Sequence, residues 1–202
     1  MIHLYQQATE ADRPTLVLFH GTGGTERDLL PLSQLMSPGS AVLSLRGNVL
    51  ENGMPRFFRR LGQGVFDEVD LVHRTKEVHK FLDKAAEQYG FDRANVAAVG
   101  YSNGANIIAS LVFHFPNVLR AAILHHPMVP LWGRQLPNLF SMPVFIGAGT
   151  NDPICSPAET DELKKLLTQA GAAVTVHWEQ HGHQLTRPEV EAAAAWYHAE
   201  VL

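Results

Sequence analysis

The feature that most constrains the fold of this chain is a series of short apolar runs, each of strand length and each bounded by Gly, Pro or Asn. The runs are residues 15–20, 41–46, 95–100, 121–126, 143–149 and 173–178. Because they are apolar on both faces, they are typical of strands in a mostly parallel sheet that helices cover on both sides. Strands with one solvated face would instead alternate apolar and polar residues. We therefore predict a central, mostly parallel sheet.

Helical patterns lie between these runs. In residues 67–89, apolar or small side chains recur every three or four positions, and Gly90 then ends the pattern as a left-handed C-cap would. Capping boxes that begin at Ser156 and Thr186 mark two further helices, each with Pro in its first turn. Alternating strands and helices predict an α/β fold, either a doubly wound or a three-layer sheet.

The composition predicts one domain over residues 1–202 and argues against several classes of function. With 46% hydrophobic and 18% charged residues, the chain has a globular composition and is long enough for one substantial core. The net charge is −4 and no basic run exceeds Arg59-Arg60, so we expect no nucleic-acid partner. The single cysteine, Cys155, indicates a reducing compartment and is expected to be a small buried residue. No apolar run approaches the roughly 18 residues of a membrane span, and we expect a cytoplasmic protein without a membrane partner.

The sequence Gly100-Tyr101-Ser102-Asn103-Gly104 matches the pattern G-x-S-x-G where a predicted strand gives way to a helical pattern. In this setting the serine occupies a tight strand-to-helix turn, and the two glycines avoid collisions with neighbouring backbone. The turn places the hydroxyl at the carboxyl edge of the sheet. Ser102 is therefore the candidate nucleophile. Its alternative role, an ordinary helix N-cap, would leave the flanking glycines unexplained.

A serine hydroxyl is a weak nucleophile unless a base takes its proton and a third group orients that base. Asp152 and His183 each follow one of the last two predicted strands. The chain order Ser102, Asp152, His183 is that expected of an α/β hydrolase, and we predict these three as the catalytic residues. The alternatives are His181 as the base and a turn before Pro153 as the role of Asp152.

Backbone amides that stabilise a developing oxyanion would complete such a site. The glycine-rich segment at residues 20–24 follows the first predicted strand, so its backbone can approach a substrate closely. We predict that the amides of Thr22 and Asn103 form the oxyanion hole. The segment lacks the lysine and the spacing of a phosphate-binding loop, and nothing in residues 177–183 would bring the three histidines there onto one ion. We expect no cofactor and no metal.

Residues 54–66 are predicted to form a long, irregular surface loop beside the site. Arg56, Phe57 and Phe58 from this loop are candidates to contact the substrate, with the arginine meeting an anionic group and the rings lining a pocket. Met128, which follows a strand end, is a further candidate. The alternative for all four is ordinary packing or a solvated surface.

Several motifs together resemble the phospholipase/carboxylesterase family of α/β hydrolases over nearly the whole chain. They are His20-Gly21-Thr22-Gly23-Gly24, Gly100-Tyr101-Ser102-Asn103-Gly104, Asn151-Asp152-Pro153 and Gly182-His183-Gln184. Three more resemble the small bacterial carboxylesterases associated with hydroquinone and electrophile resistance, namely Arg46-Gly47-Asn48-Val49, Pro55-Arg56-Phe57-Phe58 and Leu124-His125-His126-Pro127. The resemblance implies a three-layer α/β-hydrolase fold with a central, mostly parallel sheet, and a Ser-Asp-His esterase without a cofactor.

The sequence thus predicts a single-domain hydrolase that cleaves small to medium carboxylic esters through an acyl-enzyme, with a small-molecule ester as its partner. A thioesterase or lysophospholipase would use the same three residues on another acyl donor. Related acyl-protein thioesterases usually carry Gln where Asn103 stands and Asp where Gly24 stands. A non-catalytic ligand-binding protein with this fold is the alternative from a different class. The sequence leaves open whether a homodimer forms.

Overall fold

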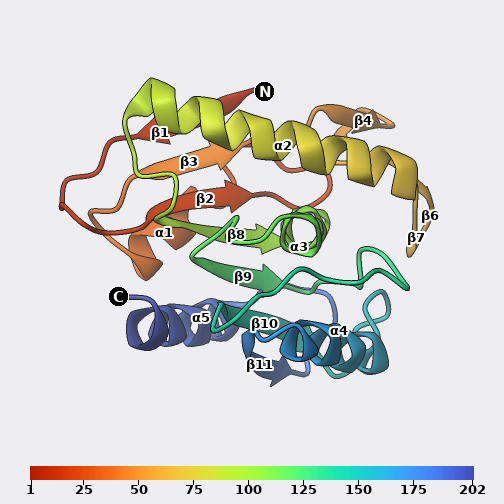
Figure 1. The fold of residues 1–202 in the computed structure, drawn as a ribbon. Helices are drawn as coiled ribbons and strands as arrows, with labels where there is room; N and C mark the ends of the chain where they lie inside the picture. The colour runs from red at the N-terminus through yellow and green to blue at the C-terminus, as the bar shows by residue number, and fades with distance from the viewer.

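The computed structural model describes all 202 residues and is built on a seven-stranded sheet. The strand order is β1, β3, β2, β8, β9, β10, β11 (Figure 1). The strands span His3–Gln6 (β1), Thr15–Phe19 (β2), Val42–Leu45 (β3), Val96–Tyr101 (β8), Ala121–His125 (β9), Pro143–Gly149 (β10) and Ala173–Glu179 (β11). β1 is antiparallel to β3, and all other neighbours are parallel. The prediction of a central, mostly parallel sheet is confirmed.

Six of these strands coincide with the predicted apolar runs, whereas β1 and helix α1 are not predicted. β1 is a four-residue edge strand that is only half-buried, so it shows no continuous apolar run. Helix α1 (Leu30–Met36) has seven residues and begins without a side-chain cap, so Pro31 in its first turn is its one start signal. Both elements are too short for periodicity to reveal them.

The four longer helices are α2 (Glu68–Tyr89), α3 (Asn103–His114), α4 (Pro157–Gln169) and α5 (Arg187–Glu200). α2, α4 and α5 carry the caps that the sequence predicts. Ser156 accepts a hydrogen bond from the amide of Glu159, and Thr186 accepts one from the amide of Glu189. Gly90 ends α2 in the left-handed region with φ of 73°. None of the helices combines the length and the apolar character needed to cross a membrane.

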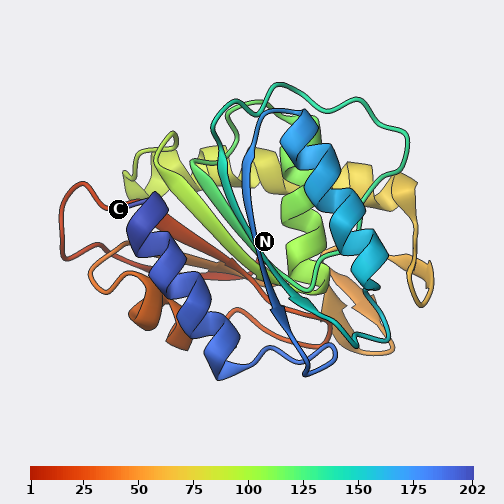
Figure 2. The same ribbon diagram turned by 90° about the horizontal axis from the view of Figure 1, so that it is seen from below.

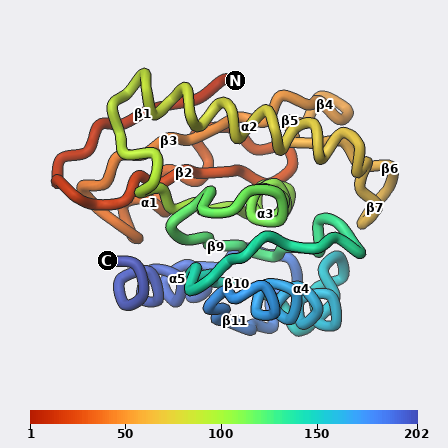
Figure 3. Tube along the Cα trace, viewed as in Figure 1, coloured from red at the N-terminus to blue at the C-terminus, as the bar shows by residue number.

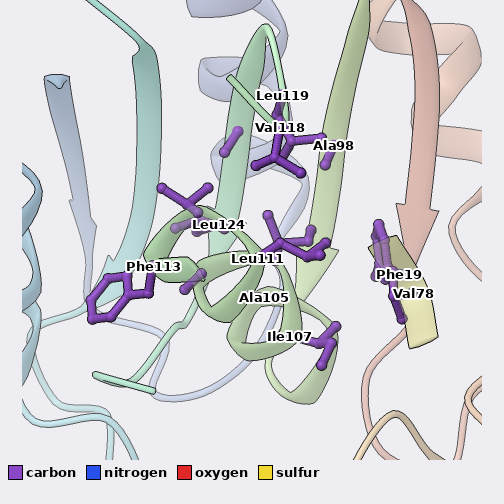
Figure 4. Packing of buried hydrophobic residues seen from close by; sticks show 14 of the residues in the cluster. Phe19, Val78, Ala98, Ala105, Ile107, Leu111, Phe113, Val118, Leu119 and Leu124 are labelled. Atoms are coloured by element: carbon purple, nitrogen blue, oxygen red, sulfur yellow. The ribbon is translucent and has the colours of Figure 1, made fainter. Parts of the chain in front are cut away.

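Helices cover both faces of the sheet. α2, α3 and α4 pack on one face, and α1 and α5 pack on the other (Figure 2). The first face holds a buried cluster of 32 residues and the second a cluster of 16. Ala105, Ile107, Leu111 and Phe113 of α3 belong to the larger cluster (Figure 4). Because nearly every residue of α3 is buried, this packing fixes the start of α3 and with it the turn at Ser102.

The structure corrects the prediction of an irregular loop at residues 54–66. Most of this stretch belongs to two short hairpins, one formed by β4 (Val49–Glu51) and β5 (Met54–Arg56) and one by β6 (Arg60–Gly62) and β7 (Val65–Phe66). Asn52 and Gly53 join the first hairpin with φ of 51° and 80°, as in a tight two-residue turn. Strands of two or three residues are too short for an alternating pattern to be read. Both hairpins lie beside the start of α2, at the edge of the sheet where its parallel strands end (Figure 3).

Candidate active site

Ser102 stands at the carboxyl edge of the sheet, between β8 and α3. Its backbone has φ of 53° and ψ of −113°, a conformation that residues with side chains rarely adopt. The two glycines of the motif permit the turn. A Cβ atom on Gly104 would collide with the carbonyl oxygen of Phe19, and one on Gly100 would lie 2.6 Å from the carbonyl carbon of Gly104. The Ser102 side chain makes no capping hydrogen bond, so its hydroxyl is available to the site.

Hydrogen bonds join the three predicted residues. The Ser102 hydroxyl donates to Nε2 of His183 at 2.8 Å, and Nδ1 of His183 donates to Oδ2 of Asp152 at 2.7 Å. The Tyr101 hydroxyl donates to the carbonyl of His183 at 2.6 Å and thereby ties the histidine loop to the end of β8. His181, the alternative base, is exposed. The arrangement allows His183 to take the proton of Ser102.

Asp152 is buried and hydrogen-bonded at both oxygens. Oδ1 accepts from the amides of Ile154 and Cys155 at 2.8 and 3.0 Å, and Oδ2 accepts from His183 and from Nδ1 of His126. Burial by itself would raise the pKa of Asp152, but these hydrogen bonds outweigh burial and hold the pKa below its usual value. Asp152 is therefore ionised at neutral pH, and its charge is shared by two imidazoles.

The amides of Thr22 and Asn103 donate no hydrogen bond within the protein, and both residues line the same cavity as Ser102. Their side chains are held in place by the first hairpin and the residues after it. Oγ1 of Thr22 accepts from the guanidinium of Arg56 at 2.5 Å, and Oδ1 of Asn103 accepts from the amide of Phe57 at 2.7 Å. Two fixed, unpartnered N–H groups beside a serine hydroxyl have the chemistry of an oxyanion hole.

The cavity at Ser102 has a volume of about 250 Å³. Two of the four side chains predicted to contact substrate, Arg56 and Met128, line this cavity. The sequence analysis does not single out most of the other lining residues, which are Arg60, Gly64, Phe66, Tyr101, Asn106, Ile154 and Cys155.

Phe57 and Phe58 do not line the cavity, which differs from the prediction. Both are buried in the larger cluster, where the ring of Phe57 contacts Phe19 and the ring of Phe58 contacts Phe66. After β5 the two rings pack into the core, whereas Arg56 just before them lines the cavity.

The guanidinium groups of Arg56 and Arg60 line the cavity. The carboxylate of Glu51 does not line it but contacts both arginines, and we call these three residues the cavity wall. Nε of Arg56 lies 3.2 Å from the carboxylate of Glu51, and Nε of Arg60 lies 2.9 Å from the same group. Burial lowers the pKa of Arg56, and the nearby Arg60 acts in the same direction, yet a guanidinium remains charged in proteins. The cavity wall therefore has a surplus of one positive charge.

Asp152 also belongs to a buried cluster with His126, Glu189 and His125, and none of the four lines the cavity. His126 has Nδ1 at 2.9 Å from Oδ2 of Asp152 and Nε2 at 3.0 Å from Oε2 of Glu189. The other oxygen of Glu189 accepts from Nδ1 of His125. All four side chains are at most 1% exposed. A Cβ atom on Gly147 would collide with Oε1 of Glu189, so this glycine makes room for the carboxylate.

The buried cluster is not predicted from the sequence. There, His125 and His126 belong to one motif of the family resemblance, and Glu189 is the last residue of a capping box. A signal was nevertheless present. Glu189 comes directly before Val190, the first residue of the apolar stripe of α5. The adjacent His125 and His126 stand at the end of a buried strand. An acid on a buried helix face needs a cationic or hydrogen-bonding partner.

Potential metal ligands approach one another at one place, where atoms of His126, Asp152 and His183 all lie within 4.8 Å. Oδ2 of Asp152 already accepts hydrogen bonds from both rings there, and we assign no metal to these residues. His177 lies on β11, where Nε2 contacts Glu179 at 3.2 Å.

Cys155 is buried next to the site. Its Sγ lies 3.3 Å from the carbonyl oxygen of His126 and 3.8 Å from Nδ1 of His183. Burial raises the pKa of the thiol, and the carboxylates of Asp152 and Glu159 act in the same direction. Cys155 is therefore a neutral packing group that lies against the histidine loop.

A mostly parallel sheet in this order, with a serine on the turn between β8 and α3, defines an α/β hydrolase. The model of the dienelactone hydrolase family matches residues 5–201. The chain belongs to the dienelactone hydrolase family and is a hydrolase. The protein MhqD of Bacillus subtilis (strain 168) is 55% identical to it over 197 residues, which cover 98% of each chain.

Solved structures agree with this assignment. The Bacillus cereus carboxylesterase matches with a TM-score of 0.97 and 61% identity over 98% of this chain and 93% of that one. A carboxylesterase from Mesorhizobium loti matches with a TM-score of 0.91 and 28% identity over 97% of this chain and 93% of that one. The predicted α/β-hydrolase fold and enzyme class are confirmed, and the matching family carries the name dienelactone hydrolase.

Proposed function

We propose that this protein is a serine carboxylesterase that hydrolyses small to medium carboxylic esters through an acyl-enzyme. The observation that carries the proposal is the hydrogen-bonded series from Ser102 through His183 to Asp152, whose serine end lies in the cavity. The likeness to carboxylesterase structures supports the same reaction class.

In the first half of the reaction, Ser102 Oγ attacks the ester carbonyl while its proton passes to Nε2 of His183. The tetrahedral oxyanion accepts hydrogen bonds from the amides of Thr22 and Asn103. Asp152 holds His183 in the tautomer that leaves Nε2 free and stabilises the imidazolium that forms. When the tetrahedral intermediate collapses, the alkoxide leaves and takes the proton from Nε2.

In the second half, a water molecule enters and repeats the cycle on the acyl-enzyme. Nε2 of His183 accepts a proton from the water as its oxygen attacks the acyl carbon. The same two amides bind the second oxyanion, and collapse returns the proton to Ser102 Oγ and releases the carboxylic acid. No redox or metal-bound group takes part in this scheme.

The size of the cavity supports short acyl groups. About 250 Å³ is just below the range of about 300 to 1,000 Å³ that pockets for drug-sized ligands occupy. A long acyl chain would have to extend out of the cavity over the surface of the hairpins. We expect the rate to be highest for esters of short acids.

The test is hydrolysis of p-nitrophenyl esters from acetyl to palmitoyl by the purified wild type, Ser102→Ala and Ser156→Ala. Ser102→Ala should lose nearly all turnover while it keeps the fold. Ser156→Ala makes the same chemical change at a helix cap and should keep turnover. Near-wild-type turnover by pure Ser102→Ala would exclude the proposed nucleophile.

The alternatives correspond to other outcomes of the same panel. A rate that rises toward palmitoyl would favour a lipase or lysophospholipase, and faster cleavage of matched thioesters would favour a thioesterase. No Ser102-dependent rate together with no labelling of Ser102 by a fluorophosphonate would indicate a binding protein, because covalent capture requires an activated hydroxyl.

A further inference from the structure

The imidazole of His126 lies between two carboxylates. Nδ1 faces Asp152 at 2.9 Å and Nε2 faces Glu189 at 3.0 Å. A neutral imidazole has one N–H donor, whereas the imidazolium has two. Both oxygens of Asp152 are occupied as acceptors, including two backbone amides on Oδ1, so Asp152 carries no proton. The geometry at both ring nitrogens is that of an imidazolium.

His125 does not carry the charge. Its Nδ1 donates to Glu189, and its Nε2 is buried without a partner. A protonated Nε2 would be an unpaired donor on a buried cation, which costs more than an unused acceptor on a neutral ring. His125 is therefore a neutral donor, and the one cation of the buried cluster is His126.

The groups that face His126 from other elements favour its protonated form. Burial alone would lower its pKa, but the hydrogen bonds and charges of Glu189 and Asp152 outweigh burial and raise the pKa. Tyr101 from β8 and Cys155 from the loop before α4 also lie against it. Burial raises the pKa of both, so both stay neutral.

Glu189 is the counterion of this imidazolium. Burial would raise its pKa, but the hydrogen bonds from His125 and His126 and the charge of His126 outweigh burial and hold the pKa below its usual value. Glu189 projects from α5, whereas His126 follows β9 with φ of 53°. The last helix thus fixes a ring at the end of a central strand.

We propose, on the basis of the function proposed above, that His126 is a positioning residue for the Asp152–His183 pair: an imidazolium, held by Glu189, that shares the Asp152 oxygen used by His183. It restrains the Asp152 carboxylate through a second donor on the same atom. It also places a positive charge next to His183, since the centroids of the two rings are 5.1 Å apart.

The positive charge has a definite consequence for pH dependence. His183 must be neutral to accept the proton of Ser102, and a neighbouring cation disfavours its premature protonation. With the imidazolium in place, the enzyme keeps its base at lower pH. Removal of the imidazolium should therefore shift the acid limb of the pH profile to higher pH.

The first test does not depend on activity. We would record the ring nitrogen signals of the histidines by NMR in the wild type, in Ser102→Ala and in Glu189→Gln. Both ring nitrogens of His126 should carry protons from about pH 6 to about pH 8, where an ordinary histidine loses one. Ser102→Ala should move the signals of His183 and leave this state of His126 unchanged. In Glu189→Gln, His126 should become singly protonated.

The second test compares His126→Asn with His177→Asn. Asparagine tolerates the positive φ and can keep a donor near Asp152, so the variant mainly removes the charge. For His126→Asn we expect the midpoint of the acid limb of kcat/KM to rise by about one pH unit. We expect its plateau kcat to fall about tenfold with little change in KM. His177→Asn, outside the cluster, should match the wild type.

Two results would overturn the proposal. One is a singly protonated His126 in the wild type at neutral pH. This result can be obtained without any variant. The other is a folded His126→Asn whose rate falls without movement of the midpoint, which would mean a structural role only. Retained turnover in Ser102→Ala would instead exclude the proposed function, whatever the NMR signals of His126.

Discussion

Two groups of charges flank the series from Ser102 to Asp152, and they differ in access and in sign. The cavity wall contains two arginines, which line the cavity, and one glutamate, which contacts both, so its surplus positive charge faces a ligand in the cavity. The buried cluster contains two carboxylates and one imidazolium and is closed to solvent. In the proposed mechanism, this surplus negative charge is balanced when His183 takes the serine proton. The two groups would therefore differ in role, the cavity wall acting on a bound ligand and the buried cluster on the His183 imidazolium.

The largest expected effect comes from the buried cluster. Asp152→Asn should lower kcat about 10⁴-fold, because an amide cannot stabilise the His183 imidazolium and favours the wrong tautomer. Single-turnover acylation by p-nitrophenyl acetate would measure the loss. Asp161→Asn makes the same change on α4 and should have no effect. An unchanged rate in Asp152→Asn would mean that another carboxylate orients the histidine.

The next effect is on stability and its pH dependence. Ionised Glu189 stabilises the fold because its pKa lies below the ordinary 4.5. This contribution is present above about pH 4.5 and is lost as the pH falls through the lowered pKa, and it amounts to a few kcal/mol. Glu189→Gln should therefore lower the free energy of unfolding by about that amount at pH 7, with a smaller difference near pH 3.

Urea denaturation at several pH values measures this difference. Glu191→Gln on the same helix is the matched control, because its contact with Arg187 is exposed and should contribute less than about 0.5 kcal/mol. Equal stability of Glu189→Gln and the wild type at pH 7 would contradict the charge assignment of the buried cluster.

The cavity wall should give smaller effects that depend on the substrate. Arg56→Met removes the surplus charge and the donor to Thr22, so kcat/KM for an ester with a second carboxylate should fall about tenfold relative to a neutral ester of equal length. Arg56→Lys keeps the charge without the planar fork and should recover the preference only in part. The measurement is the ratio of the two kcat/KM values. An unchanged ratio in Arg56→Met would mean that the cavity wall does not determine the preference for an ester with a second carboxylate.

Arg60→Gln should have the smallest effect. Its side chain is 31% exposed, so solvent screens its charge and we expect a change of about two- to threefold in the same ratio. The effect should shrink in 0.5 M salt, at which the screening length is only about 4 Å. A salt-independent loss would instead indicate direct contact with the ligand.

The sequence predicts those parts of the molecule whose structural role follows from a short local pattern. Ser102 and Asp152 follow the buried strands β8 and β10, and His183 follows the edge strand β11, so the topology of a parallel sheet brings them to one edge. The caps at Ser156 and Thr186 are local motifs and could be identified without tertiary information. The catalytic roles of these site residues remain predictions that the variants above address.

The parts that could not be predicted depend on tertiary contacts. Phe57 and Phe58 have the composition of a pocket lining, but the turn after β5 buries them. Glu189 satisfies a capping box in sequence, while its side chain reaches across to His125 and His126. The capping role of Glu189 is sufficient to explain its place in the sequence, so only its position beside the apolar stripe of α5 indicates a buried partner.

Gly147 illustrates what such a distant role means for the tolerance of the chain to change. It lies in the middle of β10 and lines no part of the cavity, yet a methyl group there would occupy the space of the Glu189 carboxylate. In a saturation mutagenesis screen scored by turnover, we expect Gly147 to be as intolerant as residues that meet the substrate. The requirement for glycine in the interior of the sheet would thus arise from a side chain of the last helix.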